Sequence, residues 1–127
     1  MSTTQSRPPG GSWGNESIEP HEYLILYIVN HTNAIVLPRV ARLVLGRTVT
    51  AEQGFDLTPY KAEQKGVSRA HAAIEISGTQ VTLTDLSSTN GTYLNNNQLK
   101  PHQPQLIRSG DQIRLGELVG YIYFSSP

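Results

Sequence analysis

The sequence predicts an all-β sandwich, and three observations support this prediction. From residue 22 onward, short runs of β-branched, aromatic and aliphatic residues alternate with turn residues, which is typical of closely spaced strands. No stretch of ten or more residues places apolar side chains at helical spacing. The 127 residues suffice for one hydrophobic core and are too few for two ordinary ones. A single β-sandwich domain is therefore expected, with a barrel as the alternative.

The first part of the chain has a different composition. Residues 1–21 are rich in Ser, Thr, Gly and Pro, and beyond Met1 their only large apolar side chains are Trp13 and Ile18. So little apolar surface does not offset the entropy lost on ordering twenty residues. We therefore expect a disordered tail or linker over residues 1–21 and a domain over residues 22–125. This segment also lacks the apolar centre of a signal peptide, which favours a cytoplasmic location.

The first expected strand covers residues 23–29, where every residue is apolar, as in a strand covered on both faces. Residues 34–37 and 41–45 predict two more strands, separated by Pro38, which cannot donate to a central ladder. Residues 72–76 and 81–86 follow, with the period-two alternation of half-exposed strands and a hairpin signal at Gly78.

The C-terminal third repeats this pattern. Further strands are expected at residues 92–94, 105–107, 112–115 and 118–124, with turns at 95–97 and 110–111. The local helix candidate is residues 59–65, where Pro59 suits the first helical position, but one or two turns is the most that this segment allows.

Composition narrows the classes of function. Ten basic and ten acidic residues give a formal net charge of zero, which favours neither a nucleic-acid nor a membrane partner. The absence of cysteine removes disulfides, thiolate metal sites and a cysteine nucleophile. The four histidines show no ligand spacing, so neither a metal nor another cofactor is expected. No apolar run approaches the roughly 20 residues of a membrane-spanning helix.

Three polar segments lie at the tips of expected strands, where a rigid sheet scaffold usually carries a binding site. They are Gly46-Arg47, Ser68-Arg69-Ala70-His71 and Ser88-Thr89-Asn90-Gly91-Thr92. Each has a simple structural explanation when taken alone. Strand-end arginines such as Arg47 are usually solvated. Asn90-Gly91 is the strongest short-range hairpin signal and requires no ligand.

The second segment also suggests catalysis, with Ser68 as nucleophile, His71 as base and Asp85 as the residue that orients the base. In a strand that begins near Ser68, residues 68 and 71 point to opposite faces, so their direct hydrogen bond would require a bend. Ser68 also lacks the Gly-x-Ser-x-Gly context of an exposed nucleophile. A serine hydrolase is therefore the least favoured alternative.

The ordered set of motifs resembles the forkhead-associated (FHA) domain, over residues 23–124. The set is Gly46-Arg47, Ser68-Arg69-x-His71, Asp85-Leu86-x-Ser88-x-Asn90-Gly91-Thr92 and Gly110-Asp111-x-Ile113-x-Leu115-Gly116. Residues 56–60 and 65–67 are also similar to bacterial members of the family. The resemblance implies a sandwich of about eleven strands whose loops at one end bind a phosphothreonine peptide.

The resemblance also assigns roles to individual residues. It implies that the phosphate is bound by Arg47, Ser68, Arg69 and Thr89, and that Asn90 binds the peptide backbone. These residue types suit the task, because a phosphothreonine carries about −1.5 to −2 charges and three strong acceptor oxygens. Gly46, His71 and Gly91 match architectural positions, and His71 is expected to brace the Ser68 loop.

The implied function is phosphorylation-dependent protein–protein interaction in signalling or regulation, by a monomeric domain that is not an enzyme. A phosphate-independent interaction through a face of the sandwich remains the alternative. Two further points stay open. Lys61 and Lys65 either favour acidic residues next to the phosphothreonine or belong to a solvated loop. Asn95-Asn96-Asn97 replaces the common Asn-Gly turn, which leaves the register of that hairpin uncertain.

Overall fold

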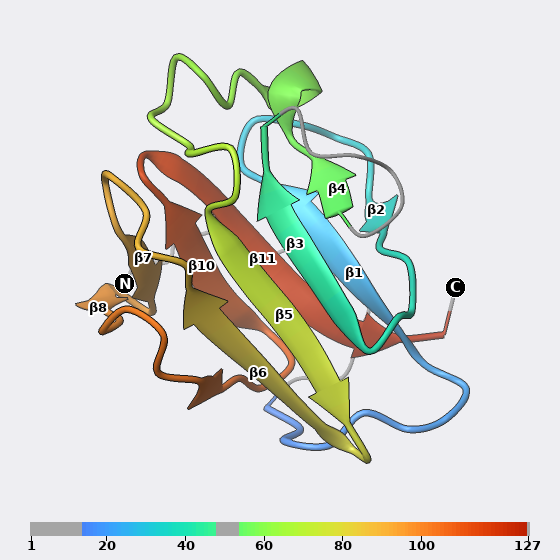
Figure 1. Ribbon diagram of the computed structural model, residues 1–127. Helices are drawn as coiled ribbons and strands as arrows, with labels where there is room; N and C mark the ends of the chain where they lie inside the picture. Colours follow the sequence, from blue (N-terminus) through green and yellow to red (C-terminus); the bar gives the residue numbers. More distant parts are fainter. Residues whose placement is uncertain (1–13, 48–53, 127) are drawn as a thin grey trace, which may run out of the picture.

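The computed structural model describes residues 14–47 and 54–126, which form two β-sheets packed face to face (Figure 1). The six-stranded sheet has the order β2-β1-β11-β10-β7-β8. Its strands are β1 (Tyr23–Ile28), β2 (Ile35–Val36), β7 (Thr92–Leu94), β8 (Asn97–Gln98), β10 (Asp111–Leu115) and β11 (Leu118–Ser125). The five-stranded sheet has the order β4-β3-β5-β6-β9. Its strands are β3 (Arg42–Gly46), β4 (Gly54–Asp56), β5 (Ala72–Ser77), β6 (Gln80–Asp85) and β9 (Gln105–Leu106). The predicted all-β sandwich is confirmed.

Strand register decides which loops meet. β3 and β5 pair antiparallel with Leu45 opposite Ala72, and β5 and β6 pair antiparallel with Ala72 opposite Asp85. The end of β3, the start of β5 and the end of β6 therefore lie side by side at one end of the five-stranded sheet. β4 runs parallel to β3 and extends the sheet beyond it.

The core lies between the sheets and follows the period of two expected for strands. Leu24, Leu26 and Ile28 of β1 are buried in it, as are Ile122 and Phe124 of β11. The intervening side chains face outward.

On the outer face, Ile25, Tyr121 and Tyr123 form a second, smaller buried cluster, against which Tyr27 packs. The prediction that residues 23–29 are covered on both faces is therefore correct at Ile25. It is wrong at Tyr23 and Val29, which are 38% and 44% exposed.

Two strands were not predicted. β8 forms because Asn95 and Asn96 both adopt positive φ, 49° and 71°, which lets Asn97 pair with Leu94 across a two-residue turn. β4 has only three residues and depends on its pairing with β3. In place of a helix over residues 59–65 there is one 3-10 turn, η1 (Thr58–Tyr60), followed by turns. No helix in the described ranges is long and apolar enough to cross a membrane.

The N-terminal boundary of the domain differs from the prediction. Ile18 is fully buried, and its N–H donates to the Thr79 carbonyl at 2.8 Å. Gly14 and Asn15 exchange backbone hydrogen bonds with Ser109, each of 2.8 Å. Residues 14–21 therefore pack onto the domain and do not form the expected disordered tail, while residues 1–13 lie outside the described residues.

Candidate functional site

The three polar segments identified in the sequence lie at one end of the sandwich. Gly46-Arg47 ends β3, residues 61–71 lead into β5 and residues 86–91 follow β6. Figure 1 shows these loops gathered where β3 and β6 end and β5 begins. Segments about twenty residues apart in the chain are therefore neighbours.

Gly46 allows the loop before β5 to lie directly against the end of β3. A Cβ atom at this position would stand 1.8 Å from the Arg69 carbonyl oxygen and 2.9 Å from that of Ser68. Neither contact is compatible with a side chain, because both involve backbone atoms. The Arg47 N–H also donates to the Ser68 carbonyl at 3.2 Å, so the two segments are joined as well as close.

Arg47 is half-buried, and a hydrogen bond to the backbone fixes the orientation of its guanidinium group. Its Nε donates to the Val67 carbonyl oxygen at 2.8 Å. Val67 is itself 1% exposed, and its N–H donates to the Ala62 carbonyl at 2.9 Å. The guanidinium group is thus held beside the Ser68 loop by a buried segment of backbone.

Ser68 joins the second segment to the third. Its hydroxyl oxygen accepts the Thr89 N–H at 3.1 Å. A hydroxyl that accepts a hydrogen bond still keeps its own hydrogen to donate. Ser68 is half-buried, whereas Thr89 and Arg69 are exposed. The two loops therefore place a hydroxyl donor and an exposed guanidinium group at the same tip.

Asn90 makes a second link between these loops. Its Nδ2 donates to the Gly66 carbonyl oxygen at 2.9 Å. The amide group carries two N–H donors and an acceptor oxygen, so this bond uses only part of its capacity. Asn90 is exposed, and its side chain is therefore both positioned and accessible.

His71 is a fully buried brace between the same loops. Its Nδ1 accepts the Ser68 N–H at 2.9 Å, which leaves Nε2 as the protonated nitrogen that donates to the Gly91 carbonyl at 2.9 Å. Burial lowers the pKa of His71 below its usual value, against the opposing effects of the Gly91 hydrogen bond and the Asp85 charge. The neutral ring is therefore favoured.

This arrangement argues against the hydrolase alternative. Both ring nitrogens of His71 are hydrogen-bonded to backbone groups, so neither is positioned to accept the proton of the Ser68 hydroxyl. The Asp85 carboxylate does not take the ring N–H, because Nε2 donates to Gly91. The chain does bend between Ser68 and His71, but the group that reaches the ring is the Ser68 backbone N–H and not the hydroxyl.

Asp85 holds the third segment in shape from beneath. Its buried carboxylate accepts the hydroxyl of Ser88 and, at 2.7 Å, that of Thr92. The Ser88 hydroxyl oxygen in turn accepts the Gly91 N–H at 3.0 Å. Asp85 thus ties down the turn. Ser88 links Asp85 to Gly91 through its hydroxyl. Its sequence position three residues after an aspartate is typical of such a turn, but no role was predicted for it.

The last strands support the site through a contact that the sequence did not reveal. The Gly91 carbonyl also accepts the Gly116 N–H at 3.0 Å, and the Glu117 N–H donates to the Lys65 carbonyl at 2.8 Å. A Cβ atom at Gly116 would lie 2.7 Å from the Lys65 carbonyl oxygen. The turn between β10 and β11 therefore closes the site behind Asn90.

A pocket of about 300 Å³ opens beside Asn90, and we name it the Asn90 pocket. Its lining residues are Gln64, Lys65, Gly66, Asn90, Arg114, Gly116 and Glu117.

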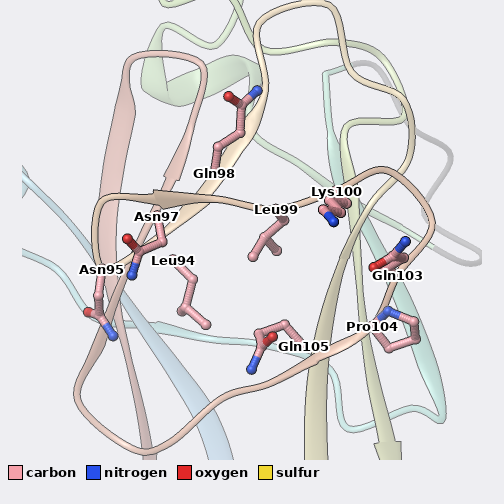
Figure 2. A pocket seen from close by; sticks show the side chains of 9 residues that line it. All are labelled: Leu94, Asn95, Asn97, Gln98, Leu99, Lys100, Gln103, Pro104 and Gln105. Atoms are coloured by element: carbon pink, nitrogen blue, oxygen red, sulfur yellow. The ribbon is translucent and has the colours of Figure 1, made fainter.

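A second pocket, of about 440 Å³, lies on the flank between the β7–β8 hairpin and β9 (Figure 2). Figure 2 shows Leu94 and Leu99 within it and amide side chains around it, among them Asn97 and Gln105. None of the predicted site residues lines this flank pocket. It presents one cation, Lys100, so it is less suited to a doubly charged anion than the tip.

The structure thus brings all eight predicted site residues to the tip of the sandwich, where hydrogen bonds join Arg47, Ser68, His71, Thr89, Asn90 and Gly91 to neighbouring loops and the Arg69 carbonyl lies against Gly46. The tip carries the guanidinium groups of Arg47 and Arg69 and the hydroxyls of Ser68 and Thr89, which are residue types that suit an anion.

Comparison with known proteins agrees with this geometry. The profile of the FHA domain matches residues 43–116, more than half of the chain. Protein FraH of Nostoc is 41% identical over 64 residues, which are 49% of this chain and 22% of FraH. The FHA domain-containing protein FhaA of Mycobacterium tuberculosis is 38% identical over 77 residues, which are 56% of this chain and 14% of FhaA. The chain thus covers less than a quarter of either relative.

Solved structures extend the similarity to most of the chain. A domain from a study of phosphothreonine-dependent FHA domain interactions aligns with a TM-score of 0.62 and 30% identity, covering 80% of this chain and 95% of that one. The FhaA FHA domain, solved in complex with the intracellular domain of Rv3910, aligns with a TM-score of 0.60 and 31% identity, covering 78% and 98%. Motif order, sandwich topology and family profile agree, and the chain belongs to the FHA domain family.

Proposed function

We propose that this domain binds phosphothreonine-containing segments of other proteins through the tip formed by Arg47, Ser68, Arg69 and Thr89. The observation that carries the proposal is the hydrogen-bonded junction of the three loops. Arg47 is held on Val67, and the Ser68 hydroxyl is held by the Thr89 N–H. Donors that are fixed before the ligand arrives lose little entropy on binding.

The donor types fit a phosphate. A phosphothreonine carries about −1.5 to −2 charges and three acceptor oxygens at neutral pH. Arg47 supplies a fork of parallel N–H donors, Ser68 supplies a hydroxyl, and Arg69 and Thr89 supply exposed donors at the rim. Charge-assisted hydrogen bonds of this kind contribute about 1.5–3 kcal/mol each. The unphosphorylated threonine offers none of these acceptors.

Asn90 has a separate role in the proposal. Its amide donates to Gly66 and keeps a further donor and an acceptor for the main chain of the ligand. Main-chain contacts fix the register of a peptide without reading its sequence. Gly46, His71 and Gly91 hold the loops, and they act on binding only through the residues that they position.

Related proteins support this assignment. One solved domain of 30% identity comes from a study of phosphothreonine-dependent interactions, and the FhaA domain was solved with a protein partner. The chain spans a small part of its curated relatives, so its protein partner is not taken from theirs. One copy carries every proposed contact, which supports action as a monomer. Both ring nitrogens of His71 are bonded to backbone groups, which supports a binding module without catalysis. We place it in the cytoplasm, where kinases have ATP for threonine phosphorylation.

Titration calorimetry tests the proposal. A degenerate phosphothreonine peptide library and its unphosphorylated counterpart are titrated into the domain, with micromolar affinity expected for the former only. Arg47→Ala and Ser68→Ala should each weaken binding by at least about ten-fold, since each removes a charge-assisted bond.

Arg42→Ala is the matched control, because Arg42 lies at the opposite end of β3 and pairs with Glu75. Equal binding of both libraries would refute the proposal. Phosphate-independent capture of a protein partner that survives Arg47→Ala would instead support recognition through a sandwich face.

A further inference from the structure

The Asn90 pocket has a composition that selects among ligands. None of its lining residues carries an apolar side chain. It adjoins the proposed peptide site directly, since Asn90 and Gly66 line the pocket and are joined by a 2.9 Å hydrogen bond. A peptide held by Asn90 therefore passes the mouth of this pocket. A pocket without an apolar wall gives little to an aliphatic side chain.

Arg114 is held in this pocket by two independent contacts. Its Nη1 donates to the Gly116 carbonyl oxygen at 2.8 Å. Its guanidinium carbon stands 3.7 Å from the centre of the Tyr93 ring, which is a stacked cation–π arrangement. Tyr93 lies opposite Arg114 in the β7–β10 ladder, so the strands themselves set this pair. A guanidinium fixed in this way loses little freedom when it binds a ligand.

The charge of the pocket is incompletely balanced. Lys65 and Arg114 supply two cations, whereas Glu117 supplies one carboxylate and is exposed. In the described part of the chain, the ion pairs within 4 Å join Arg42 to Glu75 and Arg108 to Glu16. Neither cation of the pocket takes part in such a pair. The guanidinium group has five N–H donors, of which one is used on Gly116.

We propose that the Asn90 pocket makes this domain prefer phosphothreonine segments with an aspartate or glutamate close to the phosphothreonine, bound by Arg114 with Lys65. The inference rests on the proposed function, because Asn90 must first hold the peptide beside the pocket. A carboxylate takes two parallel N–H donors from the Arg114 fork and completes the charge balance of the pocket. Arg114 is then a specificity-determining residue without contact to the phosphate.

Positional peptide arrays followed by calorimetry test this preference. Each position within four residues of the phosphothreonine is varied to Asp, Glu, Ala or Lys. One position should favour an acidic residue over alanine by about three- to ten-fold. Arg114→Gln should remove most of that preference and leave the dependence on phosphate intact. Arg42→Gln, the same substitution at the far end of β3, should leave both intact.

A charge-reversal variant distinguishes a change in specificity from a loss of folded protein. Arg114→Glu should bind the lysine variant of the peptide better than the acidic variant, which a merely unfolded protein does not do. Phosphate-dependent binding with no acidic preference, or with a preference that survives both Arg114→Gln and Lys65→Gln, would overturn this inference and leave the proposed function standing. Absence of phosphate-dependent binding would overturn the proposed function and this inference with it.

Discussion

At the scale of single residues, Gly46 is required because any side chain at this position would collide with the loop that carries Ser68 and Arg69. Gly46→Ala places a methyl group 1.8 Å from the Arg69 carbonyl oxygen, so the two loops must separate. We expect a loss of at least about 3 kcal/mol in the free energy of unfolding, together with loss of peptide binding. Chemical denaturation measures the first effect and calorimetry the second.

Gly78→Ala is the control for this substitution. Gly78 has a positive φ of 63° but nothing within 4 Å of its Cβ position, so only backbone strain applies. The cost there should be about 1 kcal/mol, with binding unchanged. Equal losses at the two glycines would show that close approach at Gly46 is not what holds the loops together.

His71 should make the stability of the domain depend on pH. Burial lowers its pKa in the folded protein, so between the folded pKa and the usual value of about 6.5 the unfolded chain binds more protons. The stability that the neutral ring contributes is therefore complete above about pH 6.5 and is lost as the pH falls through the folded pKa. Denaturation curves between pH 7 and pH 5 should show this decline.

His71→Gln provides the comparison. The variant should be less stable at pH 7 by about 1–3 kcal/mol, because the Ser68 N–H loses its acceptor. Its stability should depend less on pH than that of the parent over the same range, since the other three histidines are present in both. Identical pH slopes in the two proteins would contradict the role of His71 as a buried neutral brace.

At the scale of elements, Asp85 connects the end of β6 to the loop that carries Thr89 and Asn90. Asp85→Asn replaces a carboxylate that accepts the hydroxyls of Ser88 and Thr92 with an amide that also presents donors. We expect about 1–3 kcal/mol of lost stability and faster amide hydrogen exchange at Gly91, which is held through Ser88.

Asp111→Asn is the matched control, because Asp111 caps another turn through Asn95 and the Arg108 N–H. It should reduce stability without weakening phosphopeptide binding. If Asp85→Asn left both the exchange rate of Gly91 and the affinity unchanged, Asp85 would not be the support of this loop.

The elements also show which parts of the site and fold could be predicted from the sequence and which could not. Arg47, Ser68 and Asn90 stand out because polar side chains at strand tips break the apolar pattern. The carbonyl oxygens of Gly66 and Val67, which accept from Asn90 and Arg47, are invisible in sequence because every residue has one. β4 was not predicted because a three-residue strand shows no period and forms only by pairing with β3.

At the scale of the whole molecule, residues 14–21 belong to the folded domain. A lone isoleucine among polar residues gives no periodicity, so only the tertiary structure reveals that Ile18 is fully buried. Ile18→Ala should lower the free energy of unfolding by about 2–5 kcal/mol. Val36→Ala, at a side chain that is 48% exposed, should change it by less than about 0.5 kcal/mol. If thermal or urea unfolding showed equal losses of stability for the two variants, Ile18 would not be part of the folded core.

The sandwich as a whole serves as a rigid frame. Its core fixes the ends of β3, β5 and β6, and these ends bring Arg47, Ser68 and Thr89 together. The order of motifs therefore indicated the fold, and the same motifs predict a site at the tip. The proposed preference for acidic flanking residues depends on the Asn90 pocket, which is lined by Arg114 of β10, by the β10–β11 turn and by the loops before β5 and after β6.

The most direct test of the proposed function is an NMR titration of the isotope-labelled domain with a phosphothreonine peptide. We predict that the phosphothreonine peptide shifts the amide signals of Arg47, Ser68, Thr89 and Asn90, and that all four titrate with the same dissociation constant in the micromolar range. The unphosphorylated peptide should shift none of them. The signals of β8 and β9, beside the flank pocket, should stay unchanged with either peptide. Equal shifts with both peptides, or shifts confined to a sandwich face or to the flank pocket, would contradict binding of phosphothreonine at the tip.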